Sequence, residues 1–338
     1  MPNRTISVRL LNRAQVEALS PGPDDLIDVV ASGLAAHGRK EVVQPPKGHL
    51  QLDRLMNGHF NILSAWVGPI NRAGIKVIGD YVDNWRHGLP SEVGMLTLYD
   101  PAVGVPLCIM DATSLTWRRT GAVTCAGAMH LAPKDSTIVA HIGARGTAFA
   151  NLQLLSRKFK LREVRVNSAR PESRERLVAR VEEELGVRAK AYASAAEAID
   201  GADIVIEATR LEKPEVLIPK YAVKPGALVV TYGWMMALDP AIVLSASKVV
   251  VDDWAQCKAG GALHPLISSG QLTEGMIHAE IGQIVAGLKP GREAGDGTIV
   301  FWHRGFAVSD VVLGNWIYER AEKEGVGTLF PLLQAGEE

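Results

Sequence analysis

The chain has 338 residues, of which 47% are hydrophobic and 22% charged, so it is long enough for two globular domains with buried cores. Its formal net charge of −1 provides no basic field of the kind that binds nucleic acid or an acidic membrane surface. No apolar run approaches the roughly 20 residues of a membrane span, the N-terminus lacks a signal-peptide core, and three scattered cysteines point to a reducing, cytoplasmic location without a metal site.

Residues 1–118 combine one helical pattern, DDLIDVVASGLAAHG, with several short strand-like stretches. These stretches are HFNILSAWVG, GIKVIGDYV, GMLTLYD and PLCIMDA, and glycine, proline and aspartate separate them. Short β-branched and aromatic runs with such boundaries are typical of an antiparallel sheet. The sequence therefore predicts a mostly β domain, which residues 305–338 complete with a helix near Asp310–Glu324.

Between residues 119 and 304, apolar strands alternate with amphipathic helices. The predicted strands are TIVAHIG, EVRVNS, ADIVIEAT, ALVVTYG and KVVVDD, followed by GTIVFWHRG. After the second strand, PESRERLVARVEEELG spaces its apolar residues four apart, which indicates a helix. The alternation predicts βαβ units in a Rossmann-type, doubly wound parallel sheet, so the fold class is α/β with two domains.

The segment TIVAHIGARGTAFANLQLL starts as a strand, turns at two glycines and continues as a helix. It lies on the first strand of the predicted parallel sheet, where a dinucleotide-binding fold has its phosphate loop. Such a loop needs glycine for a tight turn and a helix N-terminus that favours negative charge. We predict that five residues hold a cofactor pyrophosphate: Gly143, Arg145, Gly146, Thr147 and Ala148. Arg145 replaces the usual second glycine, and the alternative is an ordinary strand–helix connection.

The second strand of this sheet ends in VNSARPES, where an NAD-specific site usually has an acid for the ribose 2′-hydroxyl. No acid is present, whereas Ser168, Arg170 and Arg174 are. Arg170 precedes a predicted helix start at Pro171, so a bound anion would offset the unfavourable cation at the positive end of the helix dipole. We predict that NADP(H) is preferred to NAD(H). The alternative is a pair of solvated arginines.

Three cations of the chain have mostly apolar sequence neighbours. Lys47 follows VVQPP, Lys76 lies inside the strand pattern GIKVIGDY, and Arg119 lies in LTWRRTGAV, where the two domains meet. A lysine in a strand usually faces solvent, and an arginine at a domain junction is often structural. Together, however, an arginine and one or two ammonium groups suit the carboxylate of a small substrate.

The segment KVIGDYVDNWRHGLPSEVGMLTLYDPAVGVPLCIMDATSLTWRRTGAVTCAGAMHLAP resembles the ornithine cyclodeaminase/μ-crystallin family. In that family a strand lysine, a D-x-x-x-L/I-T segment and an R-T-A/G-A helix start precede the dinucleotide loop. The resemblance extends from EVVQPPKG to FWHRGFAVSDVV, whose end is similar to the family's closing S-x-G-x-A-x-x-D pattern. The order and spacing of these motifs carry the resemblance.

The resemblance implies roles for individual residues. Lys76 matches the family's substrate lysine and Arg119 its carboxylate-binding arginine, so both are expected to act in catalysis. Lys47 lies where the family often has a second arginine. Besides the glycine loop, four residues are expected to contact the cofactor: Thr120, Thr209, Gly233 and His303, the last in place of a common serine. Secondary candidates near the substrate are Asp80, His87 and His59. Lys47, His49 and Arg118 leave room for a second acidic group on the substrate.

The family comprises amino-acid dehydrogenases, imine and ketimine reductases, cyclodeaminases and binding proteins. We predict an NAD(P)H-dependent reductase of a small α-imino acid that forms a homodimer through the mostly β domain. One alternative is an NAD-dependent cyclodeaminase. In such enzymes an aspartate follows the glycine at the end of the strand that corresponds to ALVVTYG, whereas here Trp234 follows Gly233 and Asp239 is predicted to cap the next helix. The other alternative is a nucleotide-dependent binding protein.

Overall fold

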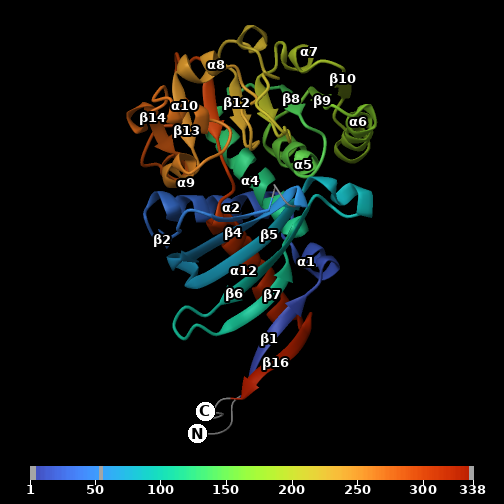
Figure 1. The fold of residues 1–338 in the computed structure, drawn as a ribbon, viewed down its shortest axis with the longest axis vertical. Coiled ribbons are helices and arrows are strands. Elements are labelled where there is room, and N and C mark those ends of the chain that lie inside the picture. The colour runs from blue at the N-terminus through green and yellow to red at the C-terminus, as the bar shows by residue number, and fades with distance from the viewer. Residues whose placement is uncertain (1–4, 53–55, 335–338) are drawn as a thin grey trace. The chain divides into compact units, whose positions relative to one another are not determined.

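A computed structural model describes residues 5–52 and 56–334 of the chain (Figure 1). The first and last four residues, which the predicted domain limits include, lie outside this part. The chain divides into two compact units, one formed by Met1–Arg119 with Ala307–Glu338 and the other by Thr120–Phe306. None of the helices in the described part combines the length and apolar character that a membrane crossing requires.

The first unit contains an eight-stranded sheet in the order β16-β1-β7-β6-β5-β4-β2, with β3 paired to β4. All neighbouring strands are antiparallel except β1 and β7, which run parallel and were not predicted as such. The strands are β1 (Thr5–Leu11), β2 (Val42–Val43), β3 (Gly48–Gln51), β4 (Gly58–Val67), β5 (Arg72–Tyr81), β6 (Glu92–Tyr99), β7 (Pro106–Asp111) and β16 (Thr328–Gln334). The helices are α1 (Arg13–Leu19), α2 (Pro23–Gly38) and α12 (Ala307–Glu324), with short 3₁₀ turns at Gly68–Ile70 and Val82–His87.

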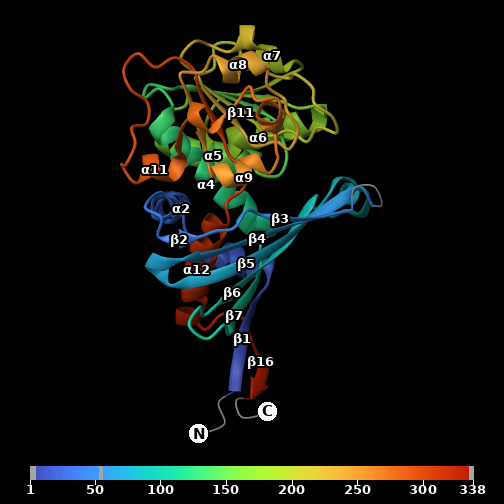
Figure 2. The same ribbon diagram turned by 60° about the vertical axis from the view of Figure 1, so that its left-hand side comes forward.

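Helix α12 covers one face of this sheet and packs on β4, β5 and β6, as the two ribbon views agree (Figures 1 and 2). Two glycines permit the close approach. A Cβ on Gly74 of β5 would lie 2.8 Å from Val311, and one on Gly314 of α12 would lie 2.4 Å from Leu96. Because side chains alternate along a strand, Gly74, Lys76 and Ile78 of β5 are buried on one face, whereas Ile75 and Val77 between them are exposed.

The second unit contains an eight-stranded sheet in the order β10-β9-β8-β11-β12-β15-β13-β14, and all its paired strands are parallel. The strands are β8 (Ile138–Ile142), β9 (Glu163–Asn167), β10 (Ala189–Tyr192), β11 (Ile204–Glu207), β12 (Leu228–Thr231), β13 (Lys248–Val251), β14 (Ile277–Glu280) and β15 (Ile299–Trp302). The helices are α5 (Ala148–Lys158), α6 (Pro171–Leu185), α7 (Ala195–Ile199), α8 (Pro240–Leu244), α9 (Trp254–Lys258), α10 (His264–Ser268) and α11 (Ile281–Val285). Helix α4 (Thr113–Leu131) contains the boundary residue Arg119, and short 3₁₀ turns lie at Lys220–Ala222 and Glu274–Met276.

The predicted α/β fold class is confirmed, and the order of the parallel strands explains the sequence pattern. Strands β8, β11, β12, β13 and β15 are buried along their whole length, which is why they are nearly continuous apolar runs. The strand order reverses between β8 and β11, because the chain goes outward to β9 and β10 and then returns. Ligands of doubly wound sheets bind beyond the carboxyl ends of the strands at such a switch point.

Candidate functional site

A buried cluster of charges lies in the first unit. The Nζ atom of Lys76, on β5, donates to Oδ1 of Asp310 at 2.6 Å and to Oγ1 of Thr116 at 3.2 Å. The Nε atom of Arg119, on α4, donates to the same Oδ1 at 2.8 Å. Side chains of Lys76 and Asp310 are 1% exposed and that of Arg119 is 6% exposed. Two cations therefore share one carboxylate oxygen almost out of contact with water.

Burial sets the chemistry of Lys76. It lowers the pKa of the ammonium from 10.5 to about 8, and the neighbouring positive charge of Arg119 acts in the same direction. The carboxylates of Asp310 and Glu92 raise the pKa, but only partly offset the loss of hydration. A lysine with a pKa near neutrality can both give and take a proton, as general acid–base catalysis requires.

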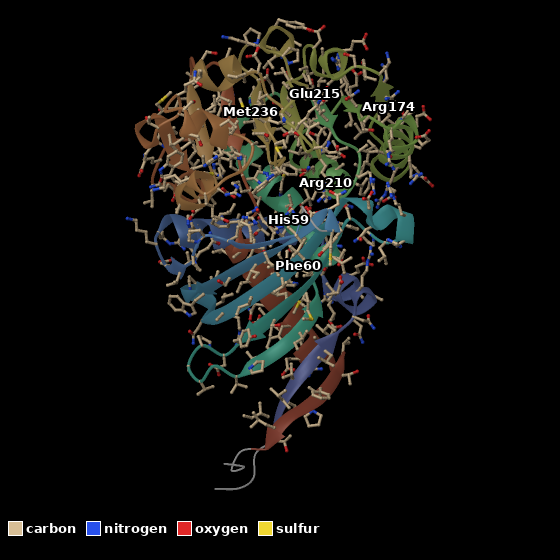
Figure 3. All side chains as sticks on the ribbon, in the orientation of Figure 1. His59, Phe60, Arg174, Arg210, Glu215 and Met236 are labelled. Carbon is tan, nitrogen blue, oxygen red and sulfur yellow. The ribbon has the colours of Figure 1, made fainter. Side chains whose placement is uncertain are left out.

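The other predicted residues of this unit are more dispersed. Lys47 is half-buried in the connection between β2 and β3, and none of the three hydrogen bonds described for Lys76, Arg119 and Asp310 involves it. His59 on β4 (labelled in Figure 3) lies opposite Asp80 on β5, with Nε2 and Oδ2 3.8 Å apart. Asp80 shares the Lys76 face of β5, whereas His87 is exposed in a 3₁₀ turn. Asp80 and His59 thus form a pair of their own, and neither is among the groups that act on Lys76.

The glycine loop of the second unit has the backbone that the predicted phosphate loop requires. It connects the end of β8 to the start of α5 at Ala148, which is buried. Gly143 has a φ of +103°, and a Cβ there would lie 2.4 Å from the carbonyl oxygen of Ala208. Gly146 also has a positive φ, +54°. Arg145 is exposed between them. Only glycine fits at 143, and the geometry suits a dinucleotide pyrophosphate.

A chain of hydrogen bonds connects the loop to neighbouring strands. The hydroxyl of Tyr232, just after β12, lies 2.6 Å from Oγ1 of Thr147 and accepts a hydrogen bond from Asn151 Nδ2 at 2.6 Å. Asn151 also contacts Nε2 of His141 at 2.9 Å. Burial lowers the pKa of His141 to about 4, so this imidazole is neutral. The ring of Tyr232 stacks on His303, with centroids 4.6 Å apart.

His303 lies deeper than a residue at the rim of a cofactor site. Its side chain is buried between the rings of Tyr232 and Phe301. Its Nε2 atom lies 3.1 Å from Oγ1 of Thr124 on α4. Thr120, one turn earlier on α4, is also buried. His303 therefore belongs to the packing beneath the ends of β12 and β15.

The end of β9 carries the predicted arginines in partly exposed positions. Asn167 ends the strand and donates to the carbonyl oxygens of Tyr192 and Ala193. Arg174, on α6 (Figure 3), donates to the Ser168 carbonyl oxygen at 2.9 Å, and Arg170 is exposed at the N-cap of α6. The loop is thus organised around Ser168, and the described residues of its VNSARP segment include no acid.

Glu207 is a buried acid at the end of β11 that the sequence analysis missed. Its carboxylate accepts hydrogen bonds from the backbone and hydroxyl of Thr209 and from the hydroxyl of Thr231 at 2.7 Å. A Cβ on Gly233 would lie 2.9 Å from the same carboxylate, which explains the glycine. Burial raises the pKa of Glu207. Glu207 thus orders the two loops that contain Thr209 and Gly233, and its signal in the sequence is an acid that directly follows the apolar run IVI in ADIVIEAT.

The chain is similar to known proteins along nearly its whole length. The model of the ornithine cyclodeaminase/mu-crystallin family matches residues 8–325. Alanine dehydrogenase of Archaeoglobus fulgidus is 30% identical over 323 residues, covering 94% of this chain and 97% of the relative. The Delta(1)-pyrroline-2-carboxylate reductase of Thermococcus litoralis, solved with NADH and L-proline, has a TM-score of 0.89 and 29% identity, covering 95% of this chain and 99% of the other. An archaeal alanine dehydrogenase dimer with bound NAD has a TM-score of 0.89 and 30% identity, covering 97% and 100%.

Proposed function

Since the chain belongs to the ornithine cyclodeaminase/mu-crystallin family, we propose that it is an NAD(P)H-dependent reductase of a small α-imino acid, which in reverse acts as an amino-acid dehydrogenase. The observation that carries this proposal is the buried pair of Lys76 and Arg119 around Asp310. An amino- or imino-acid substrate carries one carboxylate and one nitrogen that gains or loses a proton. The cluster supplies a partner for each.

The cofactor is NADP(H) or NAD(H), whose nicotinamide would supply hydride to the imine carbon or accept it from the α-carbon of the amino acid. We assign the pyrophosphate to the loop from Gly143 to Ala148, with Arg145 as a further cationic contact. Thr120, Thr209 and Gly233 complete the cofactor site in this proposal. Ser168 and Arg170 favour the 2′-phosphate of NADP(H), because a cation and a hydroxyl stand where NAD-specific sites have an acid.

The substrate carboxylate binds Arg119 in this proposal. Only Nε of this arginine has a hydrogen-bond partner among the described residues, so both terminal amino groups can hold the two carboxylate oxygens. Lys47 adds a second positive charge. His303, expected to contact the cofactor, would act here by fixing Tyr232 and Phe301, on whose rings its imidazole packs.

Lys76 handles the proton. With a pKa of about 8, it carries a proton at pH 7 and gives it to the imine nitrogen as the carbon is reduced. In the oxidative direction, the neutral amine of Lys76 accepts a proton from the substrate ammonium. Asp80 lies on the same strand face but pairs with His59, which leaves Lys76 as the principal acid–base group.

We further propose a homodimer formed by the face of the first unit's sheet opposite Lys76. Ile62, Val77 and Met95 are neighbours across β4, β5 and β6, and they are 41%, 37% and 51% exposed. A continuous exposed apolar row on a sheet is a common subunit interface, and the related archaeal alanine dehydrogenase is a dimer. A reducing, cytoplasmic location fits the three buried cysteines, which form no disulfide.

The structure gives one observation against the cyclodeaminase alternative. Asp239, the first acid after Gly233, is the N-cap of α8 and accepts a hydrogen bond from the backbone of Ala241 at 2.9 Å, as predicted. Trp234 occupies the position directly after Gly233 and is 38% exposed. The acid is therefore engaged in capping a helix rather than available to shuttle protons.

A substrate panel tests the proposed function. The purified protein is incubated with cyclic imines, or with 2-oxo acids plus ammonia or methylamine, while NADH and NADPH consumption is followed. We expect turnover with at least one α-imino acid, and no proline from L-ornithine with catalytic NAD. Proline formation at a rate comparable to the best reduction would restore the cyclodeaminase alternative. Nucleotide binding without any turnover would favour the binding protein.

A further inference from the structure

The carboxylate of Asp310 has an uneven set of partners. Its Oδ1 atom accepts from both Lys76 and Arg119, whereas Oδ2 is buried and has no hydrogen-bond partner among the described residues. Asp310 lies at the family's closing aspartate position but was not among the predicted site residues. An acid whose bonds all go to the two groups assigned to the substrate needs an explanation beyond helix packing.

The fold fixes Asp310 in this place. It lies in the first turn of α12, where the positive end of the helix dipole favours a carboxylate. The two glycine contacts described above, at Val311 and Gly314 of α12, bring the helix against β5 and β6 within four residues of Asp310. The Asp310 side chain is 1% exposed, so neither water nor a mobile counter-ion can substitute for it in the folded protein.

Electrostatics then requires an acid at this point. Two ammonium or guanidinium groups buried next to each other repel, and each also loses hydration. The charged groups that act on Lys76 come from three elements: Arg119 of α4, Asp310 of α12 and Glu92 of β6. Asp310 is the only one of them that contacts both cations among the described residues. Asp310 raises the pKa of Lys76 against burial and Arg119, so its removal should lower that pKa further.

The bond to Arg119 also has a directional effect. Asp310 engages Nε and thus one edge of the guanidinium plane. A carboxylate that bound the terminal amino groups instead would compete with a substrate carboxylate for the same atoms. The observed geometry fixes the orientation of the arginine and leaves those atoms for the ligand.

Resting on the proposed function, we propose that Asp310 is a positioning residue of the imine-reducing site, which holds Lys76 as an ammonium and orients Arg119 for the substrate carboxylate. A merely structural ion pair would contribute to folding alone. A positioning residue also determines over which pH range the enzyme works, because the reaction needs the proton on Lys76.

The first test compares the pH dependence of kcat/KM for imine reduction in four proteins. These are the wild type, Asp310→Asn, Asp310→Glu and Glu322→Gln, which removes another arginine-bound carboxylate of the same helix. In Asp310→Asn we expect kcat/KM at pH 7.5 to fall at least 100-fold. The basic limb of its pH profile should lie at least one pH unit below that of the wild type. Asp310→Glu should recover at least ten-fold over Asp310→Asn, and Glu322→Gln should keep the wild-type profile. A basic limb that stays in place in Asp310→Asn would overturn the proposal, as would an equal displacement in Glu322→Gln.

The second test needs no substrate and so separates this proposal from the proposed function. The ¹⁵Nζ resonance of Lys76, assigned by its absence in Lys76→Met, is titrated in the ligand-free protein. The wild-type lysine should be protonated at pH 7 and titrate near pH 8, and the Asp310→Asn protein should titrate at least one unit lower. A neutral Lys76 at pH 7 in the wild type overturns the proposal even if Asp310→Asn does not fold. A wild type that reduces no imine refutes the proposed function but leaves this titration decisive.

Discussion

The glycine loop and the cation cluster are built in opposite ways. The loop consists of six neighbouring residues, 143–148, whose backbone is proposed to bind the pyrophosphate, and its glycines are visible in the sequence. The cluster joins Lys76 and Asp310, which are 234 residues apart, and its function depends on side chains that are nearly all buried. Backbone recognition can be encoded locally, whereas a charge balance can be encoded only by the fold. A mutation in the cluster should therefore lower turnover without weakening cofactor binding, and a mutation in the loop should weaken cofactor binding.

The largest effect is expected from Arg119→Leu. Removing one partner of a buried, charge-assisted contact costs about 2–5 kcal/mol, so kcat/KM should fall roughly 30- to several-thousand-fold. The cofactor dissociation constant should stay within a few-fold, because the glycine loop is untouched. The control is Arg118→Leu, which removes the neighbouring arginine that donates to the carbonyl oxygen of Pro21. Equal losses in both variants would contradict the carboxylate role of Arg119.

The converse variant is Gly143→Ala. Its Cβ would meet the Ala208 carbonyl oxygen, and its φ of +103° is strained for alanine. Fluorescence titration should show cofactor binding weakened at least ten-fold. Gly186→Ala is the control, because that glycine also has a positive φ, +65°, but open space around it. It should lower the melting temperature without changing cofactor affinity. Unchanged affinity in Gly143→Ala would remove the loop from the cofactor site.

These two regions also show what the sequence can predict. The apolar runs of β8, β11 and β12 identified a buried parallel sheet, and the spacing in PESRERLVARVEEELG located α6. The alternation in GIKVIGDY predicted a strand but not which face α12 would cover, so the burial of Lys76 did not follow from it. Asp310 and Glu207 were missed for the same reason. Their partners come from other elements, and a single sequence does not show which charges meet.

The outer face of the first unit's sheet offers a third comparison, because it lies opposite Lys76 on the same strand. Val77→Asp inserts a charge into the apolar row with Ile62 and Met95. Burying an unpaired carboxylate at an interface is costly, so light scattering at micromolar concentration should give half the wild-type mass. Val216→Asp, which changes another exposed valine, should leave the mass unchanged. A wild-type monomer would contradict the predicted dimer.

Cofactor preference tests the second unit alone. The wild type should bind NADPH more tightly than NADH. Arg170→Ala should weaken NADPH binding by at least about ten-fold, since one charge-assisted contact to a phosphate is worth about 1.5–3 kcal/mol. NADH binding should change less than two-fold. Arg180→Ala is the control, because this arginine lies on the same helix but bonds Glu184. Equal wild-type affinities for the two nucleotides would refute the role of Arg170.

The smallest expected effect is on thermal stability: replacing Lys76 should stabilise the fold although it removes activity. Burial lowers the pKa of Lys76 to about 8, so the unfolded chain holds this proton more tightly than the folded one. Below pH 8 the charged lysine therefore destabilises the fold, and this penalty disappears as the pH rises from about 8 to 10.5.

Lys76→Met removes the charge, while Asp310 keeps its bond to Arg119 at 2.8 Å. We expect this inactive variant to melt a few degrees above the wild type at pH 7, with the difference narrowing by pH 9.5. Lys190→Met, at an exposed lysine of β10, should show no such pH-dependent difference. A melting-temperature difference for Lys76→Met that is constant between pH 7 and 9.5 would mean that the lysine is not charged in the folded protein at neutral pH.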